Sequence, residues 1–497
     1  MYEGRAAFAA FDFGTTTTKG AVLLPDGSFP MIGTEPNQVS VTAKGGATCR
    51  ASEALGSLQR LLSALQPRLQ EQRVTELHIG LCGHVPSLLL WDTAKSCPVD
   101  DDFPIWQDAS SRKSVPAVRE FFAEGRDIEI LATAMPAVPN WLAVMIYDRL
   151  RGTGAQGCKI LQLHDYLYHV LTGRFDSHFS GQVSIVNADS SDYADELLKF
   201  LGINRDALPE LGRSRGEPVR DPYGLFRDIY LPIETYVYPG FADRTAGFIG
   251  LELEDHDGFL LASTSENMGI FLASKHKPNA RLLRTCHGDG WIHYGSTIAG
   301  GSTVSWFVDV FGGETGRQQL SVEDLHSCAA NILPGSGGIV FHPYLNGERA
   351  PLWNDALGGS FTGLRAHHRQ PHLFRALLEG IALGKRHLLE ALRPIRPHHL
   401  KVCGGGARHP LQNEIRASVL GMDLEVYSEA EFALRGLVTF MREKIGEANT
   451  RDLLPPVESH RVEPKASWSA VYDDLYEVFI KLQESQSEIW ESLRGIR

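Results

Sequence analysis

The sequence predicts an α/β protein of two domains, each built on a mixed sheet flanked by helices. Three observations support this class. The chain has 497 residues, whereas single hydrophobic cores stop growing near ~250–300 residues. Strand-like and helix-like segments alternate along it. A pattern of strand, hydroxyl-rich turn and strand in residues 6–24 returns at 259–274. We interpret this as a weak internal repeat and expect domains 1–248 and 249–497, closing on one nucleotide in the cleft between them.

The first half of the chain alternates strand and helix signals. Two strands surround the GTTTT turn in residues 6–24, helix-like spacing follows at 51–66, and a strand is predicted at 76–82. Residues 140–172 are expected to be helical, ending at the sequence LTG. This alternation favours an α/β architecture.

The middle of the chain contains a helix, an irregular connection and a second helix-compatible stretch. The spacing predicts a helix over 191–202 with Gly202 as its C-cap. Residues 203–240 are rich in Pro, Gly and Arg, which suits an irregular connection. The sequence YPGFADRTAGFIG at 238–250 then places small residues after an acid.

The second half repeats the order of the first. A long helix is predicted at about 371–393, and LKVCGGGARHPLQNEIRASVLG at 400–421 reads as strand, glycine turn and helix. The last segment predicts a packing helix from apolar residues at helical spacing: Val471, Leu475, Val478, Phe479, Leu482, Ile489 and Leu493.

Bulk properties narrow the class of partner. The formal net charge is −12, which disfavours nucleic acid and anionic membranes as partners. No segment offers ~20 uninterrupted apolar residues for a membrane span, and the N-terminus is a poor signal peptide. The seven cysteines are scattered and never in CxxC spacing, so we expect reduced thiols in a cytoplasmic protein.

The stretch FDFGTTTTKGAVL at 11–23 permits two interpretations. Threonine favours strands and glycine favours turns, so the stretch can be a plain hairpin. Alternatively, backbone N–H groups and small hydroxyls face a phosphate chain, with the Asp12 carboxylate beside it for Mg²⁺. The stretch alone leaves both open.

Other chemistry-bearing residues are equally ambiguous when taken singly. Asp243 can be a general base for an attacking hydroxyl or a helix N-cap. The run Gly404–Gly406 can let a backbone pass near a nucleotide or be a tight turn, and it matches neither a Rossmann nor a Walker fingerprint. The histidine groups at 367–372 and 398–399 lack zinc-site spacing and are expected on surface loops.

Taken together, these motifs resemble the FGGY carbohydrate kinases, with the actin/hexokinase-type ATPase fold of two ribonuclease H-like domains. The resemblance covers nearly the whole chain, and the motifs keep the family's order: DFGTTTTK at 12–19, the GxxDxxAG-type sequence around Asp243, STSEN at 263–267, GGSTVSW at 300–306, FHPYLNGERAPLW at 341–353, GGSFTGL at 358–364, FRALLEGIA at 374–382 and GGGARHPLQNEI at 404–415.

The resemblance implies roles for individual residues and implies ATP and Mg²⁺ as cofactors. Asp12 would hold the metal, and Asp243 would activate the sugar hydroxyl. Glu348 and Arg349 would form a buried pair that braces the second domain. The nucleotide contacts would come from both domains: Gly14, Thr15, Thr16, Lys19, Thr264, Ser265, Gly301, Gly405 and Gly406.

Departures from the family concern the phosphate loop and the sugar side. Ser263 stands where many members carry glycine, and GHVPS at 83–87 replaces a GQMHG-type sequence. The implied substrate contacts are His84, Val85, Trp106, Asp108, Asp243 and Arg244.

Three functional hypotheses follow. The first is an ATP-dependent kinase acting on a ketose, polyol or sugar acid, with a xylulose-like sugar favoured. The second is a catalytically weak sugar-binding or regulatory protein that keeps the fold. The third is an actin-like ATPase with water as acceptor. The sequence leaves the oligomeric state open, with a homodimer as one option.

Overall fold

The protein is described here by a computed structural model covering residues 5–42, 45–123, 138–151, 155–187, 189–212, 215–276, 281–312, 320–428, 431–446 and 454–494. The chain divides into two compact units. Unit 1 contains residues 1–252, 285–287 and 431–456, and unit 2 contains 253–284, 288–430 and 457–497. The predicted domain boundary between residues 248 and 249 stays a prediction. The first segment of unit 1 ends at residue 252, and unit 1 also contains the later segments 285–287 and 431–456.

Unit 1 is built on a seven-stranded mixed sheet. Its order is β15-β16-β6-β1-β2-β3, and β17 also pairs with β6. Strands β1, β6, β16 and β17 run parallel, whereas β2, β3 and β15 are antiparallel to their neighbours. The bounds are β1 Ala6–Phe13, β2 Thr17–Leu23, β3 Met31–Pro36, β6 Glu76–Gly83, β15 Glu217–Pro218, β16 Glu234–Val237 and β17 Phe241–Ala242.

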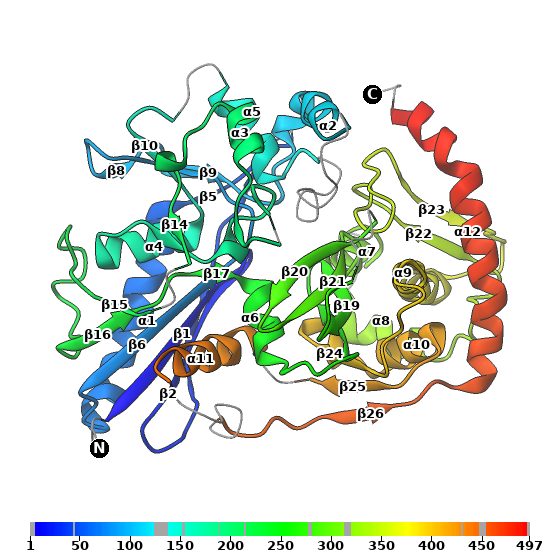
Figure 1. The fold of residues 1–497 in the computed structure, drawn as a ribbon. Coiled ribbons are helices and arrows are strands. Elements are labelled where there is room, and N and C mark those ends of the chain that lie inside the picture. Colours follow the sequence, from blue (N-terminus) through cyan, green and yellow to red (C-terminus); the bar gives the residue numbers. More distant parts are fainter. Residues whose placement is uncertain are drawn as a thin grey trace. The chain divides into compact units, whose positions relative to one another are not determined.

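The two faces of strand β1 belong to two different cores. Ala7, Ala9, Phe11 and Phe13 pack in the cluster that contains helix α1 (Ala51–Glu71) and α4 (Leu163–Thr172). The intervening residues Phe8 and Ala10 pack with helices α6 (Asp243–Gly250) and α11 (Phe432–Lys444). Since side chains alternate along a strand, Asp12 belongs to the face covered by α6 and α11 (Figure 1).

Helices α6 and α11 cross at very short range through two glycines. A Cβ atom at Gly250 would lie 2.0 Å from the carbonyl oxygen of Phe432, and one at Gly436 would lie 1.9 Å from that of Ala246. Any larger residue would force the helices apart. The crossing therefore fixes α6, and with it Asp243, against the sheet of unit 1.

A second seven-stranded sheet has the order β20-β21-β19-β18-β24-β25-β26, and all its strands belong to unit 2 except residues 285–287 of β20. Its strands β21-β19-β18-β24-β25 repeat the arrangement of β3-β2-β1-β6-β16, with an antiparallel trio followed by parallel strands. This confirms the internal repeat. The bounds are β18 Gly258–Ala262, β19 Glu266–Leu272, β20 Leu283–His287, β21 Gly290–Thr297, β24 Leu400–Cys403, β25 Leu424–Tyr427 and β26 His460–Val462.

Helices of unit 2 enclose a core shared with a two-stranded sheet. Phe341 of β22 packs with Phe374 and Ile381 of α9 and with Ile415 of α10. The bounds are α7 Gly301–Phe311, α8 Val322–Ala329, α9 Gln370–Ala391, α10 Pro410–Leu420, α12 Ala466–Arg494, β22 Val340–Pro343 and β23 Gly359–Thr362. The predicted helices at 51–66 and 371–393 and the strands at 6–24 and 76–82 are thus confirmed.

Small sheets and short helices complete unit 1. They comprise β4 Ser40–Val41, β5 Ala47–Arg50, β7 Leu89–Asp92, β8 Cys97–Pro98, β9 Asp102–Pro104, β10 Cys158–Leu161, β11 Asp176–Ser177, β12 Val186–Asn187, β13 Asp192–Tyr193, β14 Glu210–Leu211, α2 Val115–Ala123, α3 Leu142–Leu150 and α5 Asp195–Leu201. Gly202 ends α5 in the left-handed conformation at φ 73°, as predicted.

The prediction of one helical stretch over 140–172 is wrong. Strand β10 separates helices α3 and α4, and Gly157 turns the chain before it with a φ of 71°. The strand pairs with β7, so a tertiary partner overrides the apolar helical spacing. The predicted end of the stretch is right, because Gly173 caps α4 at φ 74°.

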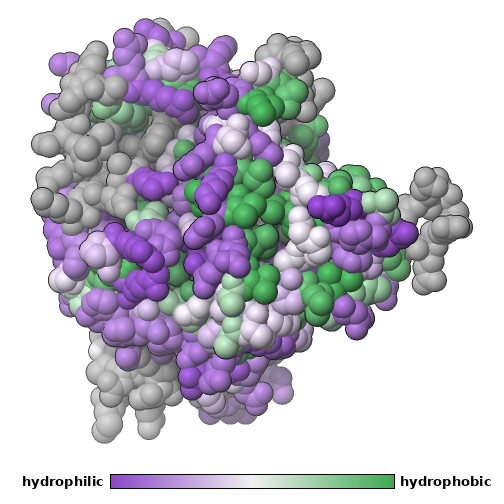
Figure 2. Space-filling view, turned by 90° about the vertical axis from the view of Figure 1, so that its right-hand side faces the viewer, coloured by the Kyte–Doolittle hydropathy of each residue, from purple (hydrophilic) through white to green (hydrophobic). Residues whose placement is uncertain are grey.

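The C-terminal helix α12 forms as predicted but buries only some of the predicted side chains, among them Phe479. Tyr472, Phe479 and Trp490 lie in the core. Four of the apolar residues used for the prediction are instead 39% to 56% exposed: Val471, Val478, Ile489 and Leu493. On the face where α12 runs, Figure 2 shows a band of hydrophobic residues flanked by hydrophilic ones. Aromatic bulk, and not spacing alone, selected the buried side.

No helix in the described part of the chain combines the length and apolarity that crossing a bilayer requires.

Candidate active site

The register of three parallel strands collects the acidic residues of unit 1. Asp12 of β1 pairs with Cys82 of β6, and Phe241 of β17 pairs with the same Cys82. Asp243 follows β17 directly and is the first residue of α6. Because parallel strands end at one edge of the sheet, the two carboxylates and the thiol meet there. The thiol of Cys82 donates a hydrogen bond to Asp12 Oδ1 over 3.4 Å.

Burial and like charge disfavour ionisation at this edge. The pKa of Asp12 is raised to about 7, first by burial and then by the charge of Asp243. Burial also raises the pKa of Asp243, against the opposing charge of Arg244. The pKa of the Cys82 thiol is raised well above its usual value by burial and by both carboxylates. Binding of a cation or a proton would therefore stabilise this cluster of acidic groups.

The N-cap role that the sequence left open for Asp243 is wrong, because the N-cap of α6 is Ala242, and the general-base role stays a prediction. Asp243 is the first residue of α6, and its Oδ1 accepts a hydrogen bond of 2.6 Å from the backbone N–H of Arg244. An acid in the first helical turn is also favoured by the helix dipole. The helix end holds the carboxylate rigidly, which a general base requires.

The predicted phosphate turn is closed by residues outside its motif. Gly14 donates its backbone N–H to the Thr17 carbonyl over 3.0 Å, and a Cβ at Gly14 would lie 2.8 Å from that oxygen. Asn37 donates its side-chain amide to the Gly14 carbonyl, and its backbone N–H to that of Thr16. The indole N–H of Trp106 donates to Thr15 Oγ1 over 2.8 Å. The turn is thus held in place by hydrogen bonds from Asn37 and Trp106.

Lys19 is engaged by an acid that the sequence reading missed. Its Nζ lies 2.7 Å from Glu431 Oε1, at the N-cap of α11. The two side chains are about one-third exposed, so the pair is accessible to an incoming phosphate. Lys19 also lies opposite Asp12 in the β1–β2 ladder and lowers the pKa of that carboxyl.

Three of the predicted sugar-side residues are buried: His84, Val85 and Asp108. His84 is buried, and burial lowers its pKa to about 4, so its ring is neutral at pH 7. Val85 is also buried. Asp108 is 1% exposed, and it accepts hydrogen bonds from Ser110 and an ion-paired one of 2.9 Å from Arg149. The Asp108 carboxylate is therefore occupied by the protein itself.

Unit 2 gathers its predicted nucleotide segments at the carboxyl ends of β18 and β24. Thr264 and Ser265 form the turn between β18 and β19. Gly301 donates its backbone N–H to the Ser263 carbonyl over 2.9 Å, which ties the start of α7 to this turn. Gly405 is exposed, and a Cβ there would meet no atom within 4 Å, whereas one at Gly406 would approach Ala262 at 3.1 Å.

The donor set at Asp12 and Asp243 suits Mg²⁺. Among the residues that the structure describes, no group of three or more His, Cys, Asp or Glu side chains forms a closed metal cage. Mg²⁺ keeps several waters and is held by one or two carboxylates plus substrate phosphates. A divalent cation beside Asp12 would also relieve the charge repulsion that raises its pKa.

Four residues of these sites escaped the sequence reading: Asn37, Cys82, Glu431 and Glu266. Asn37 lies 23 positions from Gly14, and Cys82 lies 70 positions from Asp12. Glu431 lies 412 positions from Lys19. Only Glu266 carried a signal, since it is the sole charged residue of the STSEN motif.

Comparison with known proteins decides the family. Sequence profiles of the N-terminal and C-terminal domains of the FGGY family of carbohydrate kinases match residues 7–218 and 259–440. The chain belongs to the FGGY family of carbohydrate kinases. The family resemblance, the two-domain α/β fold and the ATP-dependent sugar phosphotransferase activity predicted from the sequence are thereby confirmed.

Individual family members are similar over the whole chain at low identity. The xylulose kinase of Lactococcus lactis subsp. lactis (strain IL1403) is 23% identical over 512 residues, covering 97% of both chains. The gluconate kinase of Lactobacillus acidophilus superposes with a TM-score of 0.86 and 19% identity, over 99% of this chain and 100% of that one. The ligand-bound xylulose kinase of the same organism gives 0.85 and 20%, over 98% and 100%.

Proposed function

We propose that this FGGY kinase transfers the γ-phosphoryl group of ATP to a hydroxyl of a ketose or related polyol, with a xylulose-like sugar as the first candidate. The observation that carries the proposal is the strand register that brings Asp12 and Asp243 to one sheet edge. The full-length similarity to a xylulose kinase supports the choice of sugar.

Asp243 is the proposed general base. Burial raises its pKa toward the range in which a carboxylate can accept a proton. The hydrogen bond from the Arg244 backbone fixes its orientation, and the α6–α11 crossing fixes its helix. It would accept the proton of the sugar hydroxyl as that oxygen attacks phosphorus.

Asp12 is the proposed anchor for Mg²⁺, directly or through water. When bound, the cation would neutralise charge on the phosphates during transfer. Gly14, Thr15 and Thr16 would present backbone N–H groups and hydroxyls to the phosphates, and Lys19 would exchange Glu431 for a phosphate oxygen. Thr264, Ser265, Gly301, Gly405 and Gly406 of unit 2 remain the proposed nucleotide contacts.

His84, Val85, Trp106 and Arg244 remain proposed sugar contacts, whereas Asp108 is proposed to act through Arg149. A neutral His84 ring can accept or donate one hydrogen bond to a sugar hydroxyl. The bond between Trp106 and Thr15 links this sugar side to the phosphate turn. Specificity for a hydroxylated acceptor would follow, because a buried polar group left unpaired is costly.

The alternative of a catalytically weak sugar-binding or regulatory protein draws on Ser263 and the GHVPS segment. In the structure, the Ser263 hydroxyl bonds back to the Ser265 carbonyl within the turn. This favours the kinase, because the serine side chain satisfies its own turn instead of an external group. Retention of both Asp12 and Asp243 also favours the kinase.

The experiment that tests the proposal is ADP formation from Mg²⁺–ATP against a panel of ketoses, polyols and aldonates. Strong stimulation by one sugar supports the kinase with that substrate. ADP formation at a constant rate without sugar supports an ATPase, and none at all supports the weak binder. Replacing Mg²⁺ with EDTA should abolish the stimulated rate, and an Asp12→Asn variant should need about 10-fold more Mg²⁺.

We propose a cytoplasmic location, which the scattered cysteines support. We also keep a homodimer as the assembly to test. The exposed apolar residues of α12 provide the surface on which a second copy could pack. Light scattering of the wild type and of a Val478→Glu Ile489→Glu variant distinguishes a dimer from a monomer.

A further inference from the structure

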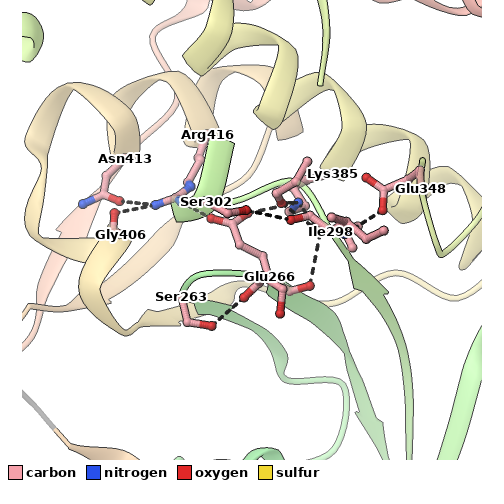
Figure 3. A network of polar contacts seen from close by, with 12 residues as sticks. Ser263, Glu266, Ile298, Ser302, Glu348, Lys385, Gly406, Asn413 and Arg416 are labelled. Atoms are coloured by element: carbon pink, nitrogen blue, oxygen red, sulfur yellow. Dashed lines mark hydrogen bonds and ion pairs between the residues drawn. The ribbon is translucent and has the colours of Figure 1, made fainter. Parts of the chain in front are cut away.

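Unit 2 contains a buried network of charged side chains next to its nucleotide segments (Figure 3). Glu266, Lys385 and Arg416 are each 1% exposed. Arg416 Nη2 donates to Glu266 Oε1 over 2.6 Å, and Lys385 Nζ lies 3.0 Å from Glu266 Oε2. One carboxylate is thus held between two cations from two helices, α10 and α9.

Two members of the network also contact backbone at or next to a nucleotide segment, and the third member directly follows such a segment. Arg416 Nη1 donates to the Gly406 carbonyl over 2.8 Å, in the glycine turn. Lys385 donates to the Ala299 carbonyl over 2.9 Å, directly before the start of α7. Glu266 is the residue that ends the turn containing Thr264 and Ser265. The three segments proposed to contact nucleotide therefore meet at one carboxylate.

Further hydrogen bonds join the segments to one another. The Gly301 and Ser302 N–H groups donate to the Ser263 and Thr264 carbonyls over 2.9 and 3.0 Å. The backbone N–H of Ile298 donates to Glu348 Oε1 over 2.7 Å. The charge of Lys385 lowers the pKa of Glu348, which burial raises. Glu348 thus accepts hydrogen bonds from the backbone N–H groups of Ile298 and Arg349 and is influenced by the charge of Lys385. The predicted buried pair between the Glu348 and Arg349 side chains stays a prediction, and the Arg349 residue is half-buried.

Stability alone is a weak reason for such a network. Removing charges from water costs about as much as their attraction returns, so apolar residues of similar size often do as well. A charged network adds directional hydrogen bonds, because a guanidinium donates to a carboxylate and a carbonyl in a fixed geometry. Here these hydrogen bonds end on the backbone at the nucleotide segments.

We propose that Glu266 is a positioning residue that holds the three nucleotide segments of unit 2 in register through Arg416 and Lys385. It does not itself contact nucleotide, because its side chain is buried. This inference rests on the proposed function only in taking these segments as the nucleotide site. Its effect is expected on nucleotide affinity and not on sugar affinity.

The test is the Glu266→Gln variant, with ADP affinity measured by isothermal titration calorimetry and KM values measured for ATP and sugar. We expect the Kd for ADP and the KM for ATP to rise about 10- to 100-fold, the usual cost of losing a supporting contact. The KM for sugar should change by less than about 2-fold, since no sugar contact rests on the network. An unchanged Kd for ADP overturns the proposal.

A matched control is Glu379→Gln. The Arg375–Glu379 pair is equally buried in the same unit, with Nε and Oε1 2.8 Å apart. Its further contacts are Ser336, Gly335 and Tyr472, which lie outside the nucleotide segments. This variant should melt at a lower temperature but keep the wild-type Kd for ADP. An equal loss of ADP affinity in both variants would reduce Glu266 to a purely structural role.

Two further variants protect the test. If Glu266→Gln yields no folded protein, Arg416→Lys keeps the charge and loses the fork to Gly406; a Kd for ADP weaker by about 3-fold or more supports the proposal, and an unchanged Kd overturns it. In Glu266→Gln Arg416→Gln, the two amides can hydrogen-bond each other, and partial rescue of the ADP affinity is expected.

The wild type separates failure of this proposal from failure of the proposed function. A wild type that binds ADP but phosphorylates no sugar contradicts the proposed function alone, whereas one that binds no ADP contradicts both the proposed function and the role of Glu266.

Discussion

Asp12 of unit 1 lies beside a like charge, whereas Glu266 of unit 2 lies between two opposite charges. In unit 1, Asp12 lies near Asp243, and burial and this like charge raise its pKa to about 7. In unit 2, Glu266 is buried more deeply than the half-buried Asp12, and it is held by Arg416 at 2.6 Å and Lys385 at 3.0 Å. Asp12 lies near the end of β1, the first strand of its hairpin, whereas Glu266 begins β19, the second strand of the corresponding hairpin in unit 2.

The two units have the same sheet arrangement but use their carboxylates in two different ways. The acids of unit 1 are left short of positive charge, so they can attract a metal ion and accept a proton. The acid of unit 2 has its charge satisfied within the protein, so it can only hold backbone in place. The carboxylates of the two units therefore differ in their charged partners as well as in their burial.

The largest effect should come from Asp243→Asn. Turnover should fall by ~10²–10⁴-fold or more, because the amide cannot accept the sugar proton. ADP binding and the melting temperature should be kept, since an uncompensated buried charge is removed. Steady-state kinetics and calorimetry check both, with the exposed Asp26→Asn of the same unit as control. Unchanged turnover would remove Asp243 from the mechanism and erase the contrast between the units.

Glu379→Gln should produce the converse result. Breaking the buried pair with Arg375 leaves a guanidinium without its carboxylate, which costs about 3–5 kcal/mol of unfolding free energy. Turnover per folded molecule should not change. Urea unfolding measures the loss, and Asp473→Asn is the control, because its pair with Arg386 is exposed and worth little. A loss below that of the control would contradict the assigned structural role.

The pH dependence of stability tests whether His342, a buried residue of unit 2, is held uncharged by its surroundings. Its Nε2 faces the Phe479 carbonyl at 3.0 Å, and burial lowers its pKa to about 4. Since the folded pKa lies below the unfolded value of ~6.5, stability is complete above pH 6.5 and falls as pH drops toward 4, by about 3 kcal/mol in all.

A His342→Gln variant should therefore lose less stability than the wild type between pH 6.5 and 4. The comparison uses urea unfolding at several pH values, so that shared contributions of the other buried histidines cancel. The exposed His398→Gln should behave like the wild type. Parallel pH profiles for wild type and His342→Gln would show that the ring is not held neutral by its site.

The smallest effect concerns the bond between Trp106 and Thr15. Trp106→Phe keeps an aromatic side chain and removes the indole N–H, at a cost of about 1 kcal/mol, or roughly 5-fold in KM for ATP. A double-mutant cycle with Thr15→Val separates this bond from other effects. Strictly additive changes would show that the phosphate turn does not depend on Trp106.

Much of the fold was readable because its signals are local. Helices at 51–66 and 371–393 and both hairpins follow from periodicity and turn residues. The stretch 140–172 failed because its apolar spacing suits a helix and a buried strand alike, and β7 decided the outcome. Helix α12 was found, but its buried side was set by the aromatic residues that the core accepts.

The site was readable as motifs but not as contacts. Asp12 and Asp243 were singled out from their surroundings in the sequence, and they do share one sheet edge. Their roles, and those of the predicted phosphate, sugar and nucleotide residues, stay predictions. The sequence could not show that Asp108 is occupied by Arg149, or that Lys19 meets Glu431.

The sequence by itself determined the order of the motifs, the repeated strand–turn–strand pattern and the family, because each of these is written in neighbouring residues. Only the tertiary structure decided which charges are satisfied. Arg416 reaches Glu266 across 150 positions and Glu431 reaches Lys19 across 412. Such pairings depend on strand register and helix docking, which place distant residues together and leave no periodic trace along the chain.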